Sequence, residues 1–220
     1  MTAPASSRQL ILDRIRTAVQ NAKGVAYADL PRDYIHRGRL DRPAVLHLMV
    51  ERLREYGADV TEAVPADLSS AIARLLESSG RRTFVLPPGL EHGWPVAGVR
   101  FKVDRDLSHE EIESCDGVIT EAFAGIADSG TIALHHSSTE GRRVISLLPD
   151  WHLCILRSSQ VVETLPECFA RCPQPPALAT YISGPSATAD IEMTRIKGVH
   201  GPRFLNVILV NDEYPSNAPR

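Results

Sequence analysis

Two segments of the chain concentrate the residue types that bind small anions or transfer protons. Residues 183–202 read SGPSATADIEMTRIKGVHGP, and residues 120–131 read TEAFAGIADSGT. Glycine permits positive φ, and the side chains of serine, threonine and aspartate bond to nearby backbone groups. Both segments can therefore present N–H groups and hydroxyls to a carboxylate or a phosphate. The same side chains can instead satisfy their own turns, and the sequence leaves both interpretations open.

Three side chains in or beside these segments have chemistry suited to catalysis, namely Glu121, Asp190 and His200. His200 can exchange a proton near neutral pH or, alternatively, fix its turn by bonding to neighbouring carbonyls. Asp190 is two residues from Glu192, so these carboxylates diverge, and a capping role for Asp190 is the alternative. A role for Glu121 as a base or a coenzyme A acceptor rests on analogy of fold. The sequence therefore assigns no catalytic residue.

The sequence indicates no metal or cofactor bound by this chain. His135 and His136 are adjacent, so on a strand they point to opposite faces and do not ligate one ion together. The four cysteines form no C-x-x-C pair, which argues against a zinc ribbon or an iron–sulfur cluster. No G-x-G-x-x-G motif follows a predicted strand.

Composition excludes several classes of partner. The net charge is −3 and the isoelectric point is about 6.2, with acids and bases interspersed, so no basic field is available for nucleic acid. No apolar run is long enough to span a bilayer, and the N-terminus MTAPASSRQL lacks the pattern of a signal peptide. We therefore expect a cytoplasmic protein. Its 220 residues suffice for one large domain with a full core or for two small domains, and we favour one domain.

Short apolar strands alternate with amphipathic helices along most of the chain. We expect helices in residues 7–23, with Ser7 as N-cap, and in residues 43–56, 66–78, 109–114 and 161–170. The helix near residue 109 begins with the capping box formed by Ser108 and Glu111. We expect strands in residues 59–64, 83–86, 99–103, 118–120, 131–134, 152–157, 177–182 and 204–210. Residues 30–41 are polar and contain proline and glycine, which predicts an exposed arm.

This alternation predicts a three-layer α/β fold with a mostly parallel central sheet. Ligands in such sheets bind outside the carboxyl ends of the strands. Residues 120–130 and 183–202 are both predicted to be loops that follow strand ends, so we expect them to line one crevice. We expect residues 1–58 to be a helical and loop region packed on the core, residues 59–212 the α/β domain, and residues 213–220 a flexible tail.

Three motifs carry a family resemblance. Residues 117–134 (GVITEAFAGIADSGTIAL), residues 146–156 (SLLPDWHLCIL) and residues 183–202 resemble, in this order, the lactate-utilisation protein C family, whose members contain the LUD domain. The resemblance implies a fold similar to those of ribose-5-phosphate isomerase, glucosamine-6-phosphate deaminase and the coenzyme A transferases. The resemblance also implies that the protein acts together with iron–sulfur subunits in the oxidation of L-lactate to pyruvate. The clusters are then expected in those partner subunits and not in this chain. The family pattern gives no established catalytic residues.

The recurring family positions map onto both segments. They are Thr120, Gly125, Asp128, Gly130, Thr131, Ser183, Gly184, Pro185, Ser186, Thr188, Asp190, Glu192, Gly198, His200, Gly201 and Pro202. Ala187 stands where some relatives carry a basic residue, which weakens the expectation of an anion contact there. The predicted ligand-binding residues are Thr120, Gly125, Asp128, Ser129, Gly130, Thr131, Ser183, Gly184, Ser186, Thr188, Asp190, His200 and Gly201.

Three hypotheses of function follow. The first is an accessory subunit of an iron–sulfur L-lactate oxidation system, with a crevice for a small carboxylate or phosphate. The second is a free-standing enzyme that acts on a sugar phosphate or an acyl-coenzyme A. The third is a scaffold or sensor that binds a small anion without chemistry. We favour the first because three separate motifs support it.

Overall fold

The computed structural model describes residues 6–21, 24, 26, 29–174, 176–188, 196–197 and 201–213. The chain divides into two compact units, with the division after Tyr34. None of the described helices is both long and apolar enough to cross a bilayer.

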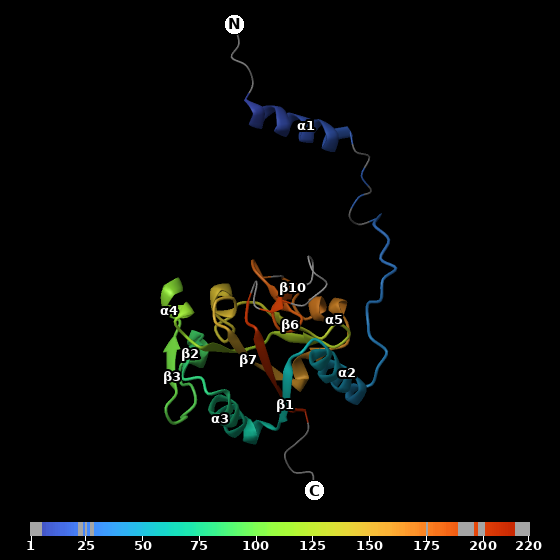
Figure 1. The fold of residues 1–220 in the computed structure, drawn as a ribbon. Coiled ribbons are helices and arrows are strands. Elements are labelled where there is room, and N and C mark those ends of the chain that lie inside the picture. Colours follow the sequence, from blue (N-terminus) through green and yellow to red (C-terminus); the bar gives the residue numbers. More distant parts are fainter. Residues whose placement is uncertain are drawn as a thin grey trace. The chain divides into compact units, whose positions relative to one another are not determined.

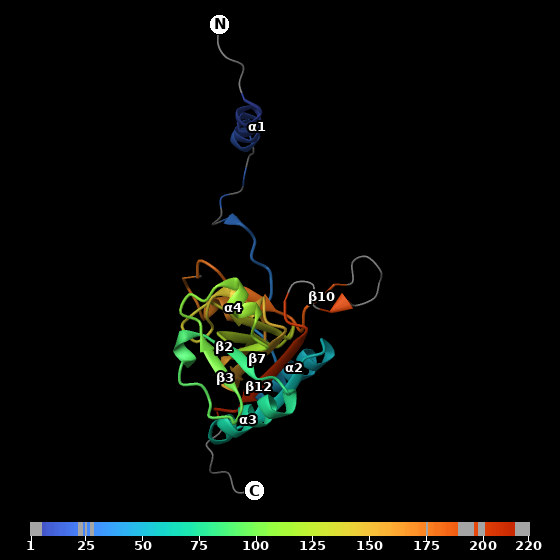
Figure 2. The ribbon, with the colours of Figure 1, turned by 60° about the vertical axis from the view of Figure 1, so that its left-hand side comes forward.

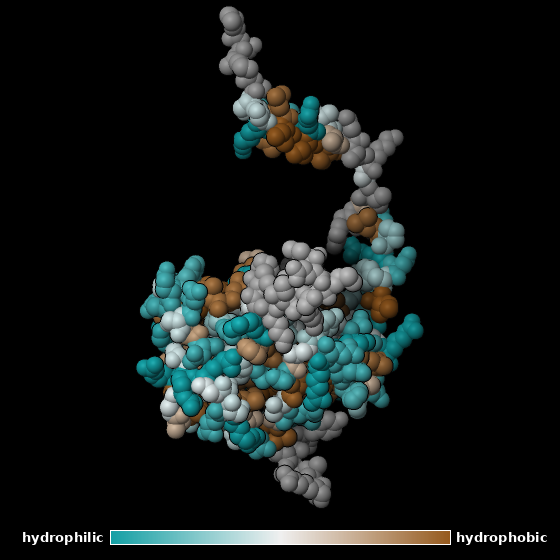
Figure 3. All heavy atoms as spheres, in the orientation of Figure 1, coloured by the Kyte–Doolittle hydropathy of each residue, from teal (hydrophilic) through white to brown (hydrophobic). Residues whose placement is uncertain are grey.

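The N-terminal unit contains helix α1 (Ser7–Asn21). The Oγ atom of Ser6 accepts a hydrogen bond from the Gln9 amide at 3.3 Å, so Ser6 and not Ser7 caps the helix. Apolar side chains gather along one side of α1 (Figure 3). They include Ile11 and Val19, which are 58% and 68% exposed. The predicted amphipathic helix is therefore confirmed, with its apolar side exposed.

The larger unit is built on a six-stranded sheet in which every neighbouring pair of strands is parallel. The strands, in spatial order, are β1 (Asp59–Ala63), β12 (Phe204–Val210), β7 (Trp151–Arg157), β4 (Gly117–Glu121), β2 (Thr83–Leu86) and β3 (Arg100–Val103). The strands β7 and β12 are mostly apolar and almost entirely buried, as expected for strands that are covered on both faces. The predicted parallel central sheet is confirmed.

In the described part of this unit, four helices and four 3₁₀ turns accompany the sheets. They are α2 (Arg42–Glu55), α3 (Leu68–Ser79), α4 (His109–Glu113), α5 (Leu165–Ala170), η2 (Pro65–Asp67), η3 (Pro88–Leu90), η4 (Arg143–Ser146) and η5 (Ser158–Gln160). The Asp41 side chain caps α2 by accepting from the Ala44 amide at 3.0 Å. The predicted capping box is present, because Ser108 and Glu111 each accept the other's amide.

A second, smaller sheet was not predicted. Its order is β8 (Val161–Val162), β5 (Ala124–Ile126), β6 (Thr131–Leu134) and β9 (Thr180–Ile182), and a separate hairpin joins β10 (Ala187–Thr188) to β11 (Ile196–Lys197). Two expectations are therefore wrong. Residues 161–170 are not one helix, since they begin with β8, and residues 120–130 are not a loop, since they contain β5. Both short strands exist because they pair with neighbours in this sheet.

The layers follow from which side chains each sheet face buries. One face of the central sheet packs on α3 through Ile72, Leu76 and the strand residues Phe84 and Leu153. The opposite face packs on α2 and the small sheet, and α5 covers the outer side of the small sheet. In Figure 1, α3 lies below the central sheet and β6 and α5 above it; Figure 2 shows the same unit from another side. The α/β three-layer prediction is confirmed.

The exposed arm predicted in residues 30–41 is anchored near its end. The Gly38 amide donates to Glu167 at 3.2 Å and the Leu40 amide donates to Glu163 at 2.7 Å. Helix α2 then packs in the same core as β1, β7 and β12. Of the predicted tail, only Glu213 is described, and its carboxylate pairs with Arg42 at 2.7 Å.

Candidate functional site

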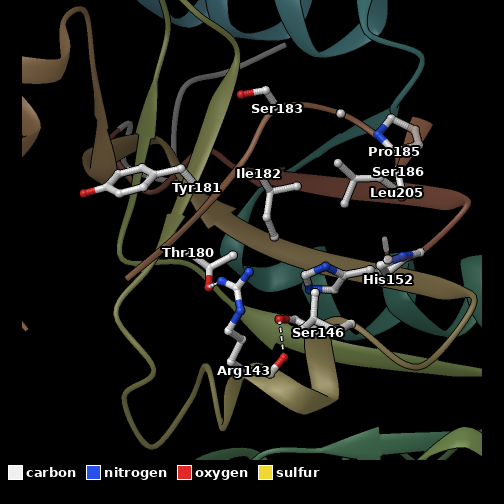
Figure 4. Close-up of a pocket in the computed structure, with 14 residues that line it drawn as sticks. Arg143, Ser146, His152, Thr180, Tyr181, Ile182, Ser183, Pro185, Ser186 and Leu205 are labelled. Carbon is white, nitrogen blue, oxygen red and sulfur yellow. Dashed lines mark hydrogen bonds between the residues drawn. The ribbon is translucent and has the colours of Figure 1, made fainter. Parts of the chain in front are cut away.

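A pocket of about 270 Å³ lies between the two sheets (Figure 4). We call it the His152 pocket. It is lined by Arg143, Ser146, Leu147, His152, Thr180, Tyr181, Ile182, Ser183, Gly184, Pro185, Ser186, Gly201, Pro202 and Leu205. In Figure 4 the ring of Tyr181 points away from the other labelled side chains, whereas His152, Ser146 and Leu205 face one another across one end.

The pocket lies at the amino ends of the central strands. His152 and Leu205 are the second residues of β7 and β12. The expectation of a crevice at the carboxyl ends is therefore wrong for residues 183–202. The reason is that this segment follows β9 of the small sheet and leads into the start of β12. A hydrogen bond of 2.8 Å from the Ser186 amide to the Pro202 carbonyl ties its two ends together.

A directed chain of hydrogen bonds fixes the orientation of Arg143. His136 Nδ1 lies 2.8 Å from the Gly141 carbonyl oxygen, which can only accept, so Nδ1 carries the proton. In the neutral ring Nε2 must then accept, and it accepts from the Thr180 hydroxyl at 2.8 Å. The Thr180 oxygen in turn accepts from Arg143 Nη1 at 2.6 Å. The hydroxyl proton thus points away from Arg143, and Thr180 holds the guanidinium by a lone pair.

His152 forms a buried wall of the pocket. His152 is only 1% exposed, and its Nε2 atom lies 2.8 Å from the hydroxyl oxygen of Thr120 on β4. Burial lowers the pKa of His152 to about 4, because desolvation penalises the charged ring. The ring is therefore neutral near pH 7.

Further hydroxyls lie around the pocket in two groups. Ser146 donates to the Arg143 carbonyl at 2.9 Å, as the dashed line in Figure 4 shows. On the other side, the Ser183 hydroxyl lies 2.7 Å from that of Thr131, which lies 2.8 Å from that of Ser129. These three hydroxyls connect the two segments that the sequence singled out. They also line a neighbouring apolar pocket of about 210 Å³ beside α5.

The electrostatics of the pocket favour an anion. Among the described residues that line it, Arg143 carries the only charge, and no aspartate or glutamate is present. Apart from the bond to Thr180, the guanidinium of Arg143 makes no hydrogen bond to a described residue. A guanidinium has five N–H donors in a planar fork that matches a carboxylate. In the part of the chain that the structure describes, no cluster of three His, Cys, Asp or Glu side chains is placed to hold a metal.

The predicted ligand-binding residues separate into groups. Ser183, Gly184, Ser186 and Gly201 line the His152 pocket. Thr120 reaches it through His152, and Thr131 and Ser129 reach it through Ser183. Asp128 is exposed and does not line it, and Gly125 lies within β5. Thr188 is described only as part of β10, and Asp190 and His200 lie outside the described residues.

Two of the predicted glycines are explained by packing against α2. Gly130 and Gly184 have φ values of +57° and +86°, which non-glycine residues rarely adopt. A Cβ atom would lie 2.7 Å from the Cβ of Arg52 at Gly130, and 2.7 Å from the Cβ of Tyr56 at Gly184. Glycine is required at both positions for the segments to approach the helix, whether or not a ligand binds.

Glu121 has a partner that accounts for its charge. It lies at the carboxyl end of β4 and accepts from Arg157 Nη2 at 3.0 Å. It does not line the His152 pocket.

Sequence reasoning missed Arg143 and His152 as candidates. Arg143 follows a polar loop in which no single feature distinguishes it from its neighbours. His152 had a usable signal, because it is a titratable residue inside the apolar run WHLCIL of a predicted strand. A buried histidine is uncommon enough that the run itself could have marked it.

The fold and the pocket define an α/β protein with a parallel central sheet and a polar pocket at the amino ends of its strands. The LUD domain matches residues 90–210 of the sequence. The chain belongs to the LUD domain family.

Individual relatives agree with this assignment. The chain is 36% identical to lactate utilization protein C of Deinococcus radiodurans over 214 residues, which cover 96% of this chain and 100% of that protein. It is 35% identical to lactate utilization protein C of Bacillus subtilis over 134 residues, 56% of this chain and 55% of the relative. A crystal structure of a DUF162 family protein from D. radiodurans matches with a TM-score of 0.65 and 34% identity, over 79% of this chain and all of that chain. The family resemblance read from the three motifs is confirmed.

Proposed function

We propose that this protein is an accessory subunit of an L-lactate oxidation system and that its His152 pocket binds a small carboxylate. Membership of the LUD domain family supports the first part, together with similarity to relatives named lactate utilization protein C. In this proposal iron–sulfur clusters of partner subunits take the two electrons that leave L-lactate as it becomes pyruvate, while two protons are released. This chain contributes the carboxylate site.

The observation that carries the second part is that Arg143 is the only charged side chain among the described residues of the pocket and forms no ion pair with any of them. Arg143 is held by Thr180, and its other N–H groups make no bond to described residues. Hydrogen bonds between a guanidinium and a carboxylate are stronger than neutral ones, since both partners are charged. The hydroxyls of Ser146, Ser183 and Ser186 add neutral partners for a polar ligand.

Calorimetric titration of the purified protein with L-lactate tests the carboxylate site. Arg143→Ala removes the cation, and Arg105→Ala is a matched control because Arg105 is an exposed arginine that pairs with Glu91 away from the pocket. We expect wild type and Arg105→Ala to bind alike and Arg143→Ala to bind at least about tenfold more weakly, the effect of a charged hydrogen bond. Equal affinity in all three proteins would contradict a site at Arg143.

Co-purification tests the accessory role. The tagged protein isolated from lactate-grown cells should carry cysteine-rich iron–sulfur partners, and its deletion should impair growth on L-lactate. If the protein is recovered alone and its deletion leaves growth on lactate unchanged, the accessory role is wrong.

A further inference from the structure

We propose that the pocket is selective for short monocarboxylates with an oxygen on C2, with Arg143 binding the carboxylate and His152 Nδ1 binding the C2 oxygen. This inference rests on the proposed carboxylate site and goes further by naming the ligand class and the residue that selects it. A 2-hydroxy acid and a 2-oxo acid share this chemistry.

The first argument is the half-satisfied ring of His152. Nε2 is paired with Thr120, but within the described part of the chain Nδ1 has no hydrogen-bond partner. Among the described residues, Asn211 Oδ1 is the only fully buried side-chain oxygen or nitrogen without a partner, so the unpaired Nδ1 of His152 is not sealed inside the core. His152 is only 1% exposed as a residue, and it lines the pocket. An unpaired nitrogen that is open to a pocket is a group suited to a polar ligand atom.

The second argument is the charge of the ring. Burial lowers the pKa of His152 to about 4, so near neutral pH the ring is an uncharged donor or acceptor. A neutral ring does not compete with Arg143 for the carboxylate. The neutral ring can form a hydrogen bond with a neutral oxygen of the ligand. A hydroxyl group can pair with Nδ1 in either tautomer of the ring, because a hydroxyl both donates and accepts. A C2 keto oxygen satisfies the tautomer in which Nδ1 carries the proton.

The third argument is the apolar remainder of the pocket. Leu147, Ile182 and Leu205 lie among its polar groups. Their side chains suit a short alkyl group such as the methyl of a three-carbon acid. The volume of about 270 Å³ lies just below the usual range of about 300 to 1,000 Å³ for small-molecule sites, which suits a small acid.

Thr120 has the role of a positioning residue in this scheme. Its hydroxyl holds Nε2 of His152 at 2.8 Å and so fixes the ring orientation that points Nδ1 to the ligand. Thr120 does not itself line the pocket.

The test is calorimetric titration of the full-length protein with L-lactate, pyruvate and propionate. Propionate has the same carbon chain as lactate but lacks the C2 oxygen. We expect wild type to bind L-lactate or pyruvate about five- to a hundredfold more tightly than propionate, because propionate leaves the imidazole nitrogen unpaired. In His152→Leu this preference should fall to within about twofold while propionate affinity is retained. Thr120→Val should reduce the preference and Thr120→Ser should keep it.

The outcomes separate the two proposals. If wild type binds propionate as tightly as lactate and pyruvate, selectivity for the C2 oxygen is wrong while the carboxylate site stands. If no acid binds, or if Arg143→Ala binds all three as wild type does, the carboxylate site itself is wrong. Should His152→Leu fail to fold, ¹⁵N spectra of the histidine rings in wild type decide the matter. The Nδ1 resonance of His152 should shift with lactate or pyruvate and not with propionate, and an unchanged resonance overturns the inference.

Discussion

Acidification should destabilise the protein through His152. The folded-state pKa of this residue is lowered from 6.5 to about 4 by burial. The unfolded chain therefore binds more protons than the folded protein between these two values, so the free energy of unfolding decreases as pH falls. The contribution is fully present above about pH 6.5 and is lost progressively down to about pH 4.

The magnitude follows from the size of the pKa shift. One pKa unit corresponds to about 1.4 kcal/mol, so the full effect is about 3 kcal/mol. Integration of the two titration curves gives a loss of about 2 kcal/mol by about pH 5. Because domains are typically stable by about 5 to 15 kcal/mol, a loss of this size is measurable.

Urea denaturation of wild type and His152→Leu at about pH 7.5 and about pH 5 provides the assay. Carboxylates with lowered pKa values, such as Asp150 and Asp212, also weaken the fold in acid, but they are common to both proteins and cancel. Wild type should lose about 2 kcal/mol more than the variant between the two conditions. Equal losses, or a His152 pKa near 6.5 in an NMR titration, would refute the reasoning.

Three other predictions concern packing, ion pairing and thiol reactivity. Gly184→Ala should destabilise the protein by about 1 to 3 kcal/mol more than Gly57→Ala. Both glycines have positive φ, but an added Cβ atom would meet a neighbouring residue, Tyr56, only at Gly184. Equal unfolding midpoints of the two variants would contradict this. Arg142→Ala should cost about 2 to 4 kcal/mol in urea denaturation, since it strands a carboxylate that is 1% exposed, whereas Arg105→Ala at a surface pair should cost under about 1 kcal/mol. Similar costs for the two arginines would argue against stabilisation of the buried Asp104 by Arg142. Mass spectrometry after brief native alkylation should find Cys172 labelled and the other three thiols, which are buried with raised pKa values, unlabelled. Labelling of a second cysteine would show that the core opens readily.

The elements of the central sheet were largely predictable, because their signals are local. Residues 83–86 and 204–210 are short, mostly apolar runs, and the structure has strands with these bounds. The capping box at Ser108 is equally local. Residues 124–126 carry no such signal, since Gly125 weakens a strand and only pairing with β6 and β8 makes one.

The site was predictable in part. Residues 183–202 were identified as functional from their composition, and Ser183 and Ser186 do line the pocket. Its position at the amino ends of β7 and β12 was not predictable, because it depends on β9 joining the small sheet. Arg143 becomes distinctive only through its bond to Thr180, a residue far from it in sequence. Contacts between residues that are far apart in the chain arise only in the tertiary structure, and they leave no pattern in a single sequence.

The central claim is that the His152 pocket binds a small carboxylate through Arg143. A crystal structure of the protein with L-lactate tests it most directly. The account predicts lactate in the pocket, with its carboxylate on the guanidinium of Arg143 and its hydroxyl on Nδ1 of His152. Lactate bound elsewhere on the protein, or bound in the pocket with its carboxylate turned away from Arg143, would contradict it.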